Sequence, residues 1–212
     1  MSATCVATVA AMMSPAPTAE AKADLARPRV MWQQCVERAL QCFPTGGGYH
    51  TGRNIPPGFR QTAWTGLDRA VRVTATGVCV DPYLATPSFC SSATYLLLLK
   101  SLELYEKTCG VMPPRKEWEY LKPYTVDHRP YPIQNDGVGA WGRANANGPG
   151  MAELAHELKI GTNLYIGTTG EYANLADRNE MFASIRRYDF MKIFWNDEIG
   201  KDERGHMVVV LG

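Results

Sequence analysis

The 212-residue chain lacks several patterns that would assign it to a common class. None of its six cysteines forms a Cys-x-x-Cys pair, and no Cys/His cluster has zinc-ligand spacing. No apolar run approaches the roughly 18 residues that a membrane-spanning helix needs. A formal net charge of only +1 gives no reason to expect a nucleic-acid or anionic-membrane partner. The glycine run at 46–48 lacks the Gly-Lys-Ser/Thr ending of a phosphate loop, so we expect no nucleotide there.

The first 27 residues differ in character from the rest of the chain. Residues 3–13 are small and apolar, and a Pro/Ala-rich stretch with the triplet Ala19-Glu20-Ala21 follows. This order is typical of the end of a secretory signal, although no Lys or Arg precedes the apolar run. Two interpretations are open, a degenerate signal peptide and a disordered leader. We therefore expect a leader over 1–27 and one domain over 28–212, a length that can bury a real core.

The clearest element follows Cys90. Residues 93–104 are apolar nearly all round, which predicts a helix covered on most sides and ending before Gly110. Apolar residues at helical spacing predict a second helix that begins at Pro28 and stops at Pro44. The remaining expected elements are strands near 71–73 and 164–166, helices over 150–158 and 178–187, and strands over 188–195 and 206–211.

The cysteine spacing leaves the disulfide question open. Cys35 and Cys42 are seven residues apart, on one face of a helix but too distant along it for a bridge. A bridge between Cys79 and Cys109 is compatible with the sequence but does not follow from it.

Two distant segments carry the functional argument. Cys90 stands at the opening of the buried helix, and His206 opens the hydrophobic run Gly-His-Met-Val-Val-Val at 205–210. The amino end of a helix favours the thiolate form of a cysteine, and its backbone N–H groups can bind an oxyanion. Imidazole is the usual base for a cysteine nucleophile. Each residue alone is also explained by packing, so the pair is the informative observation.

The order of these segments resembles the NlpC-like and CHAP-like peptidoglycan hydrolases of the papain-like cysteine peptidase superfamily. The residues that carry the resemblance are 87–99 around Cys90, 189–195 as the Gly-Asp strand, and 205–212 as the Gly-His strand. The resemblance implies an α+β papain-like fold, with the cysteine-bearing helix packed on an antiparallel sheet. It implies Cys90 as nucleophile, His206 as general base, and a peptide amide of the bacterial cell wall as substrate.

The chain departs from the family pattern at three places. Tyr188 stands where the family has the Gly of its Gly-Asp step, and Phe89 stands where many relatives have Asp. The third family residue, which orients the imidazole, belongs on a strand after the histidine strand, and the sequence ends at Gly212. Either the natural protein continues past Gly212, or a different group orients His206. Asn196 and Asp197 are the candidates that this chain offers for that role. The sheet is also expected to have an unpaired edge.

The segment 141–150 is a candidate wall of the substrate cleft. Trp141, Arg143, Asn145 and Asn147 supply an aromatic face, a cation and two amides, which suit a sugar-peptide with carboxylates. The alternative is a glycine-rich connector whose asparagines satisfy turns.

Together these observations predict a cysteine peptidase or amidase that works through a thioester without a metal or organic cofactor. Its expected partner is peptidoglycan or another peptide substrate, and its expected location is outside the bacterial cytoplasm, secreted or periplasmic. Two alternatives remain: a non-catalytic wall-binding or protein-interaction module on the same fold, and a cysteine-dependent acyltransferase.

Overall fold

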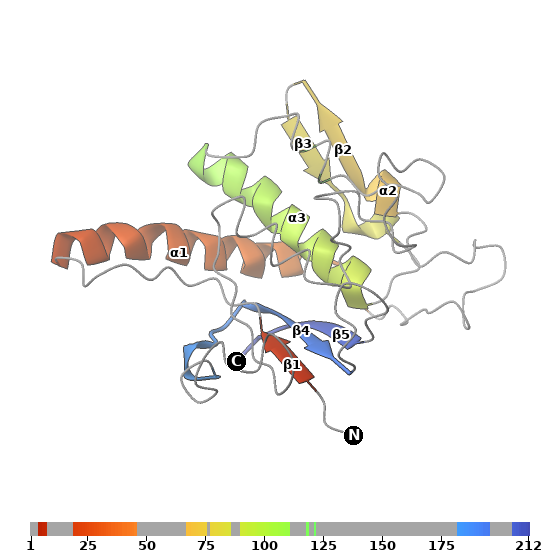
Figure 1. Ribbon diagram of the computed structural model, residues 1–212. Helices are drawn as coiled ribbons and strands as arrows, with labels where there is room; N and C mark the ends of the chain where they lie inside the picture. The colour runs from red at the N-terminus through yellow and green to blue at the C-terminus, as the bar shows by residue number, and fades with distance from the viewer. Residues whose placement is uncertain are drawn as a thin grey trace.

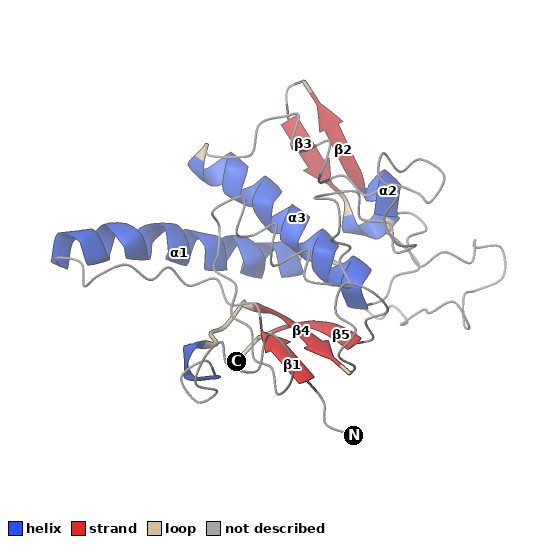
Figure 2. Cartoon of the chain, viewed as in Figure 1, coloured by secondary structure: helices blue, strands red, loops and turns tan. Residues whose placement is uncertain are grey.

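The fold combines helices with small antiparallel sheets, as a mixed α+β class requires (Figures 1 and 2). The computed structural model describes residues 4–7, 19–45, 67–75, 77–85, 90–110, 118, 121, 182–195 and 205–212. Helix α3 lies between a β-hairpin on one side and a three-stranded sheet on the other, and α1 crosses it (Figure 1).

Helix α1, Ala19–Leu40, begins earlier than the sequence pattern predicts. Pro28 lies inside the helix rather than at its first position. The prediction that the helix begins at Pro28 was therefore wrong. The apolar spacing does identify the buried face, because Cys35, Val36 and Ala39 are at most 2 % exposed. The helix ends as expected, with a turn in which the Phe43 N–H donates to the Leu40 carbonyl.

Helix α3, Cys90–Cys109, confirms the buried helix predicted after Cys90 and extends it at both ends. Its surface is covered on most sides, and Leu96, Leu99 and Leu102 are at most 1 % exposed. A helix that is apolar nearly all round needs partners around it. Here α1, the hairpin and the three-stranded sheet supply them.

The hairpin consists of β2, Val71–Thr74, and β3, Gly77–Val80, paired antiparallel. It confirms the strand predicted near 71–73. The short helix α2, Leu67–Ala70, precedes it, and the 3-10 helix η1, Pro82–Leu84, follows it. The Asp81 carboxylate accepts from the Tyr83 N–H and caps η1, where Pro82 takes the first position.

The three-stranded sheet consists of β1, Thr4–Ala7, β4, Phe190–Phe194, and β5, Gly205–Val209, in the order β1-β4-β5. Both pairings are antiparallel. Strands β4 and β5 confirm the two strands expected near the carboxyl end. Residues 4–7 of the expected leader thus form a strand, and 19–27 belong to α1.

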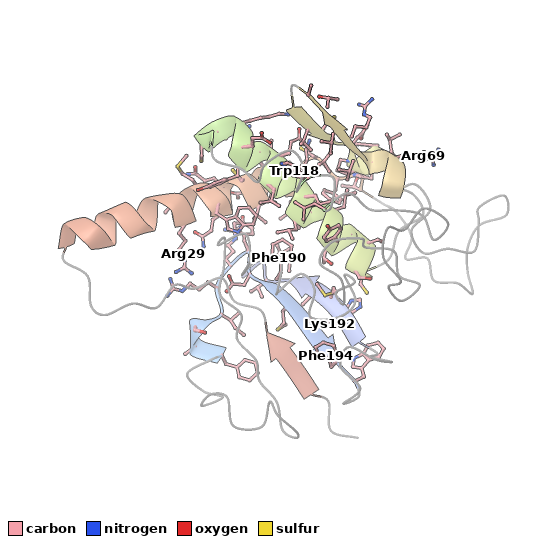
Figure 3. All side chains as sticks on the ribbon, turned by 45° about the horizontal axis from the view of Figure 1, so that its top comes forward. Arg29, Arg69, Trp118, Phe190, Lys192 and Phe194 are labelled. Carbon is pink, nitrogen blue, oxygen red and sulfur yellow. The ribbon has the colours of Figure 1, made fainter. Side chains whose placement is uncertain are left out.

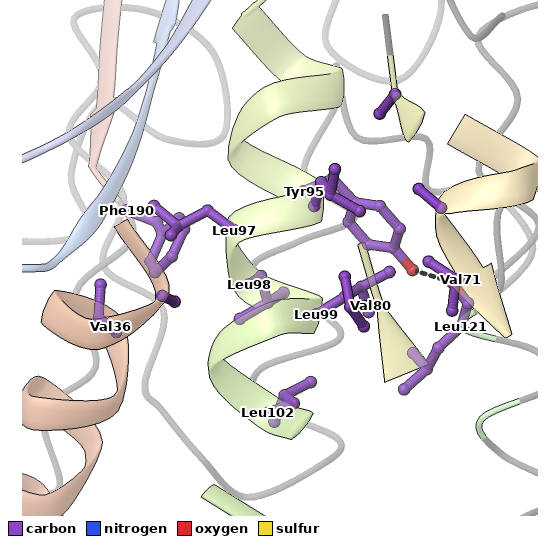
Figure 4. Packing of buried hydrophobic residues seen from close by; sticks show 14 of the residues in the cluster. Val36, Val71, Val80, Tyr95, Leu97, Leu98, Leu99, Leu102, Leu121 and Phe190 are labelled. Atoms are coloured by element: carbon purple, nitrogen blue, oxygen red, sulfur yellow. Dashed lines mark hydrogen bonds between the residues drawn. The ribbon is translucent and has the colours of Figure 1, made fainter. Parts of the chain in front are cut away.

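The hydrophobic core surrounds α3 (Figure 4). Leu97 points toward Phe190 of β4 and Val36 of α1, whereas Tyr95 and Leu99 point toward Val80 on the hairpin side. The buried apolar residues of one cluster therefore come from α1, α3, both sheets and residues 118 and 121. Burial of this surface is the main stabilising contribution to the fold.

One predicted helix is shorter in the structure, and two other predicted elements lie outside the described residues. Residues 182–184 are helical, but the chain then turns, so the helix expected to reach residue 187 ends earlier. The expected helix over 150–158 and the expected strand over 164–166 lie outside the described residues.

Candidate functional site

Cys90 is the first residue of α3, as the sequence predicts. Its side chain is partly buried and packs against the hydrophobic core. The Cys90 carbonyl accepts a hydrogen bond of 2.8 Å from the Thr94 hydroxyl, which fixes the first turn. The first turn of any helix leaves backbone N–H groups without an intrahelical acceptor, so this end of α3 offers donors beside a thiol.

Ser91 supplies a second polar group in that turn. Its side chain is fully buried, and its hydroxyl oxygen has no hydrogen-bond partner in the part of the chain that the structure describes. Buried hydroxyl groups are nearly always hydrogen-bonded, and exceptions often mark functional positions. Among the described residues of α3, Ser91 is the one whose buried side-chain oxygen has no hydrogen-bond partner.

His206 is the second residue of β5 and lies opposite Ile193 of β4. The preceding residue must be glycine, because a Cβ on Gly205 would collide with the backbone carbonyl oxygen of Ile193. The Gly-His pair that the sequence pattern singled out therefore has a structural reason for its glycine: the two backbones approach closely where β5 begins.

The structure brings the elements that carry the two predicted residues into contact. Helix α3 packs on β5, and the end of α3 that begins with Cys90 is the end that lies over β5 (Figures 1 and 3). The two segments are more than a hundred residues apart in the sequence. Their contact is the long-range feature that a cysteine–histidine site requires.

The alternation of side chains along β5 places its residues on two faces. Met207 is 4 % exposed, Val209 packs against the same core, and that core includes the leucines of α3. Successive side chains of a strand point to opposite faces. The side chain of His206 therefore points away from the face of β5 that carries Met207 and Val209, which is the face that packs against α3. The structure thus brings together the two elements, but the alternation does not direct His206 toward Cys90.

The turn that leads into β4 contains an unusual backbone conformation. Tyr188 has a φ of 72°, in the left-handed region that glycine adopts without strain. This is the position at which the family pattern has glycine. The conformation is held by the Tyr188 N–H, which donates to the Val210 carbonyl at 2.6 Å, and by the guanidinium of Arg187 over the Tyr188 ring.

Asp189 closes the same turn with its carboxylate, which accepts from the Arg186 N–H at 2.7 Å. Burial raises the pKa of Asp189 to about 6, although that hydrogen bond and the cations Arg29 and Arg186 act in the opposite direction. The Asp189 carboxylate therefore stabilises the turn before β4, and its raised pKa lies close to neutral pH.

Helix α1 supports this turn with polar side chains on one face. The Gln33 side-chain amide donates to the Arg187 carbonyl at 3.3 Å, and the Glu37 carboxylate lies 3.8 Å from the Arg187 guanidinium. The turn before β4 is thus fixed between α1 and the last residues of the chain.

Several residues named from the sequence are not placed by the structure. Asn196 and Asp197 lie outside the described residues, as do the proposed cleft residues Trp141, Arg143, Asn145 and Asn147. Phe89 lies outside them too. The bridge considered between Cys79 and Cys109 is not formed: both are free thiols.

Sequence reasoning missed one buried charge near the site. Lys192 of β4 is 3 % exposed, and its ammonium lies 5.2 Å from the centre of the Phe194 ring. The register places Lys192 directly opposite Met207, on the core-facing side of the sheet. Residues 190, 192 and 194 lie on one face of β4, and the two phenylalanines of this set could have indicated that Lys192 is buried. A lysine in a strand, however, normally indicates a face exposed to solvent.

Comparisons of the chain with protein-family models, curated proteins and solved structures find no match. Among the helices described, none is long and apolar enough to cross a membrane. Within the described ranges, no three His, Cys, Asp or Glu side chains form a group able to hold a metal ion.

Proposed function

We propose that the protein is a cysteine hydrolase with a papain-like arrangement, in which Cys90 is the nucleophile and His206 the general base. The observation that supports this proposal is the contact between the cysteine end of α3 and β5, the strand that the Gly-His pair opens. The alternation along β5 opposes it, because it places His206 on the face of the strand away from α3. The left-handed backbone at Tyr188, where the family pattern has glycine, adds support from an independent position.

The reaction follows from the chemistry of these groups. The Cys90 sulfur attacks the carbonyl carbon of an amide, while His206 accepts the thiol proton. Backbone N–H groups in the first turn of α3 stabilise the oxyanion that develops. The C–N bond then breaks, His206 returns the proton to the leaving amine, and a thioester remains. Water hydrolyses the thioester, which releases the acid and restores the thiol.

The resemblance supports peptide amides of peptidoglycan as the substrate, and hence a secreted or periplasmic location in a bacterium. In this proposal Asn196 or Asp197 orients the imidazole, and Trp141, Arg143, Asn145 and Asn147 line the substrate cleft. No metal or organic cofactor takes part in the reaction as written.

Thiol reactivity tests the proposal within one molecule. Cys79 is an exposed free thiol on β3 and serves as the internal reference. We expect iodoacetamide to modify Cys90 faster than Cys79 at neutral pH, as measured by mass spectrometry of the peptides, although Cys90 is the more buried of the two. The substitution His206→Ala should remove this advantage. His156→Ala, at a histidine outside the segments that carry the family resemblance, should leave it unchanged.

A second candidate function is favoured by one observation. Because the alternation along β5 directs His206 away from the side of Met207, the fold is also compatible with a non-catalytic module that binds cell-wall or protein partners. This alternative predicts that Cys90 reacts no faster than Cys79 and that His206→Ala does not change its rate. That result would overturn the catalytic proposal.

Product analysis separates hydrolysis from acyl transfer. Purified peptidoglycan incubated with the protein should release new amino groups, and Cys90→Ser should abolish the release, whereas Cys79→Ser should not. If an added amine such as glycine is incorporated into the product in preference to water, the enzyme is an acyltransferase that uses the same pair of residues.

A further inference from the structure

Three sulfur-containing side chains meet where α1 crosses the end of α3. Met31 and Cys35 are one helical turn apart on α1, and Cys109 is the last residue of α3. We call these three residues the sulfur cluster. It lies at the opposite end of α3 from Cys90, so it is separate from the proposed active site.

The geometry of the sulfur cluster fits metal coordination. The Cys109 Sγ lies 4.0 Å from the Met31 Sδ. Metal–sulfur bonds are about 2.3 Å long, so two sulfur ligands of one trigonal ion are about 4 Å apart. The two helices therefore already hold this pair of sulfur atoms at the separation that a shared ion would impose.

Cys35 belongs to the same group of contacts. It lies one helical turn after Met31 on α1, and its thiol lies close enough to the Cys109 thiol for the two to interact electrostatically. Cys35 and Cys109 are both free thiols.

The burial of the three residues differs in a way that suits a binding site. Cys35 is 2 % exposed, whereas Met31 and Cys109 are partly exposed. An ion can therefore reach the cluster from the side of Cys109 and become enclosed against Cys35. Arg38, one turn beyond Cys35, interacts electrostatically with its thiol and would balance the negative charge of a bound thiolate pair.

We propose that the sulfur cluster is a binding site for a soft monovalent metal ion, Cu⁺, with the Cys35 and Cys109 thiolates and the Met31 thioether as ligands. Thiolate and thioether ligands select Cu⁺ over the harder divalent ions, which prefer nitrogen and oxygen donors. Binding displaces both thiol protons, so one Cu⁺ enters, two H⁺ leave, and the site carries one negative charge. No electron is transferred.

Competition with a chelator measures the affinity of the sulfur cluster for Cu⁺ in the 212-residue chain. The reduced protein is titrated with Cu⁺ in the presence of the chromogenic chelator bicinchoninate. Ascorbate and a nitrogen atmosphere keep the copper as Cu⁺. We expect one Cu⁺ to be held per chain in competition with the chelator, and X-ray absorption to show sulfur ligands around it. The substitution Cys109→Ser should weaken binding by more than about 100-fold, beyond what the loss of an outer-shell group costs.

Two further variants make the assignment specific. Met31→Leu keeps the size and apolar character of the side chain and should weaken binding by about 10-fold. Cys79→Ser, at an exposed cysteine outside the cluster, should leave the affinity unchanged. Circular dichroism checks that each variant folds. If Cys109→Ser does not fold, the change in Cu⁺ affinity of Met31→Leu alone tests the proposal.

Three results would overturn the proposal. The first is equal affinity in the wild type, Cys109→Ser and Met31→Leu. The second is a loss with Cys79→Ser as large as that with Cys109→Ser. The third is oxidation of Cys35 and Cys109 to a disulfide on exposure to oxidised glutathione in a chain that retains no Cu⁺, which would make the pair a redox site instead.

Discussion

Helix α3 is held in different ways on its two sides. On the hairpin side, which faces β2 and β3, polar groups fix it in place: the Glu103 carboxylate accepts from the Val80 N–H at 3.0 Å and from the Lys100 ammonium at 2.8 Å. The same ammonium donates to the Val80 carbonyl at 2.8 Å. On the sheet side, which faces β4 and β5, the contacts described are mostly apolar, such as Leu97 with Phe190.

This difference shows where the molecule has directional constraints and where it has packing alone. Hydrogen bonds and ion pairs fix both distance and orientation, whereas apolar contacts fix mainly the distance between surfaces. The hydrogen bonds on the hairpin side therefore fix the rotation of α3 about its axis and its position along β3. The cysteine end of the helix lies over β5, and the packing of apolar side chains fixes its position there.

The largest expected effect tests the hairpin side directly. Glu103 is 2 % exposed and also pairs with Lys107. Glu103→Ala would leave the Val80 N–H without its acceptor and the Lys100 ammonium without its carboxylate partner, so that only the Val80 carbonyl accepts from Lys100. We expect a loss of about 3–5 kcal/mol in the free energy of unfolding, measured by urea denaturation. Glu103→Gln keeps an acceptor and should lose less. A loss below about 1 kcal/mol for Glu103→Ala would remove the contrast between the two sides.

The next effect concerns a charge at the sheet side and depends on pH. The pKa of Asp189 is raised from 3.8 to about 6 by burial, so the folded state binds a proton that the unfolded state releases between these values. Its contribution to stability is present below pH 4 and is lost as the pH rises through 6, by up to about 3 kcal/mol. Urea denaturation from pH 4 to 7 should show this slope, and Asp189→Asn should remove it. Parallel pH profiles for the two proteins would contradict the prediction.

A smaller effect is expected from one neutral hydrogen bond on the hairpin side. The buried Tyr95 hydroxyl donates to the Leu121 carbonyl at 2.6 Å (Figure 4). Tyr95→Phe keeps the ring and leaves that carbonyl without this donor, at a cost of about 1–2 kcal/mol. Tyr83→Phe, at a side chain that is 63 % exposed, should change stability by less than about 0.5 kcal/mol. Equal midpoints of thermal unfolding for both variants would show that the bond contributes nothing.

The smallest effect should have the opposite sign and lies at the cysteine end of α3. Because the Ser91 hydroxyl is buried without a partner among the described residues, Ser91→Ala should be neutral or stabilising by up to about 1 kcal/mol. Ser101, another fully buried serine of α3, donates to the Leu97 carbonyl at 2.7 Å, so Ser101→Ala should be less favourable. Thermal unfolding of the two variants gives the order directly, and a destabilised Ser91→Ala protein would contradict it.

Much of the fold is local and could be predicted from sequence. The apolar surface of α3 and the stripe on α1 report burial through the helical period, and the strands β4 and β5 were expected from their apolar runs; each of these elements was identified correctly. The start of α1 was not, because Pro28 is accepted inside the helix. The Glu103 and Lys100 links to Val80 were also missed, since charged residues on a helix normally indicate solvent.

The candidate site is long-range, and sequence could predict only parts of it. The apolar residues after Cys90 and the apolar run after His206 placed these two residues at the beginnings of their elements, as the structure finds. Which side of β5 meets α3 depends on register and packing, and the period of two in 205–210 is masked by an unbroken apolar run. The sulfur cluster was missed because Met31, Cys35 and Cys109 match no sequence motif and meet only where two helices cross.

Strand β1 gives the amino-terminal segment a structural task. Thr4–Ala7 pairs with β4 along its whole length, so β4 is an interior strand while these residues are attached. A proteolytic cut after Ala21 would detach that strand from the polypeptide and turn β4 into an exposed edge, which is a template for pairing with an extended peptide.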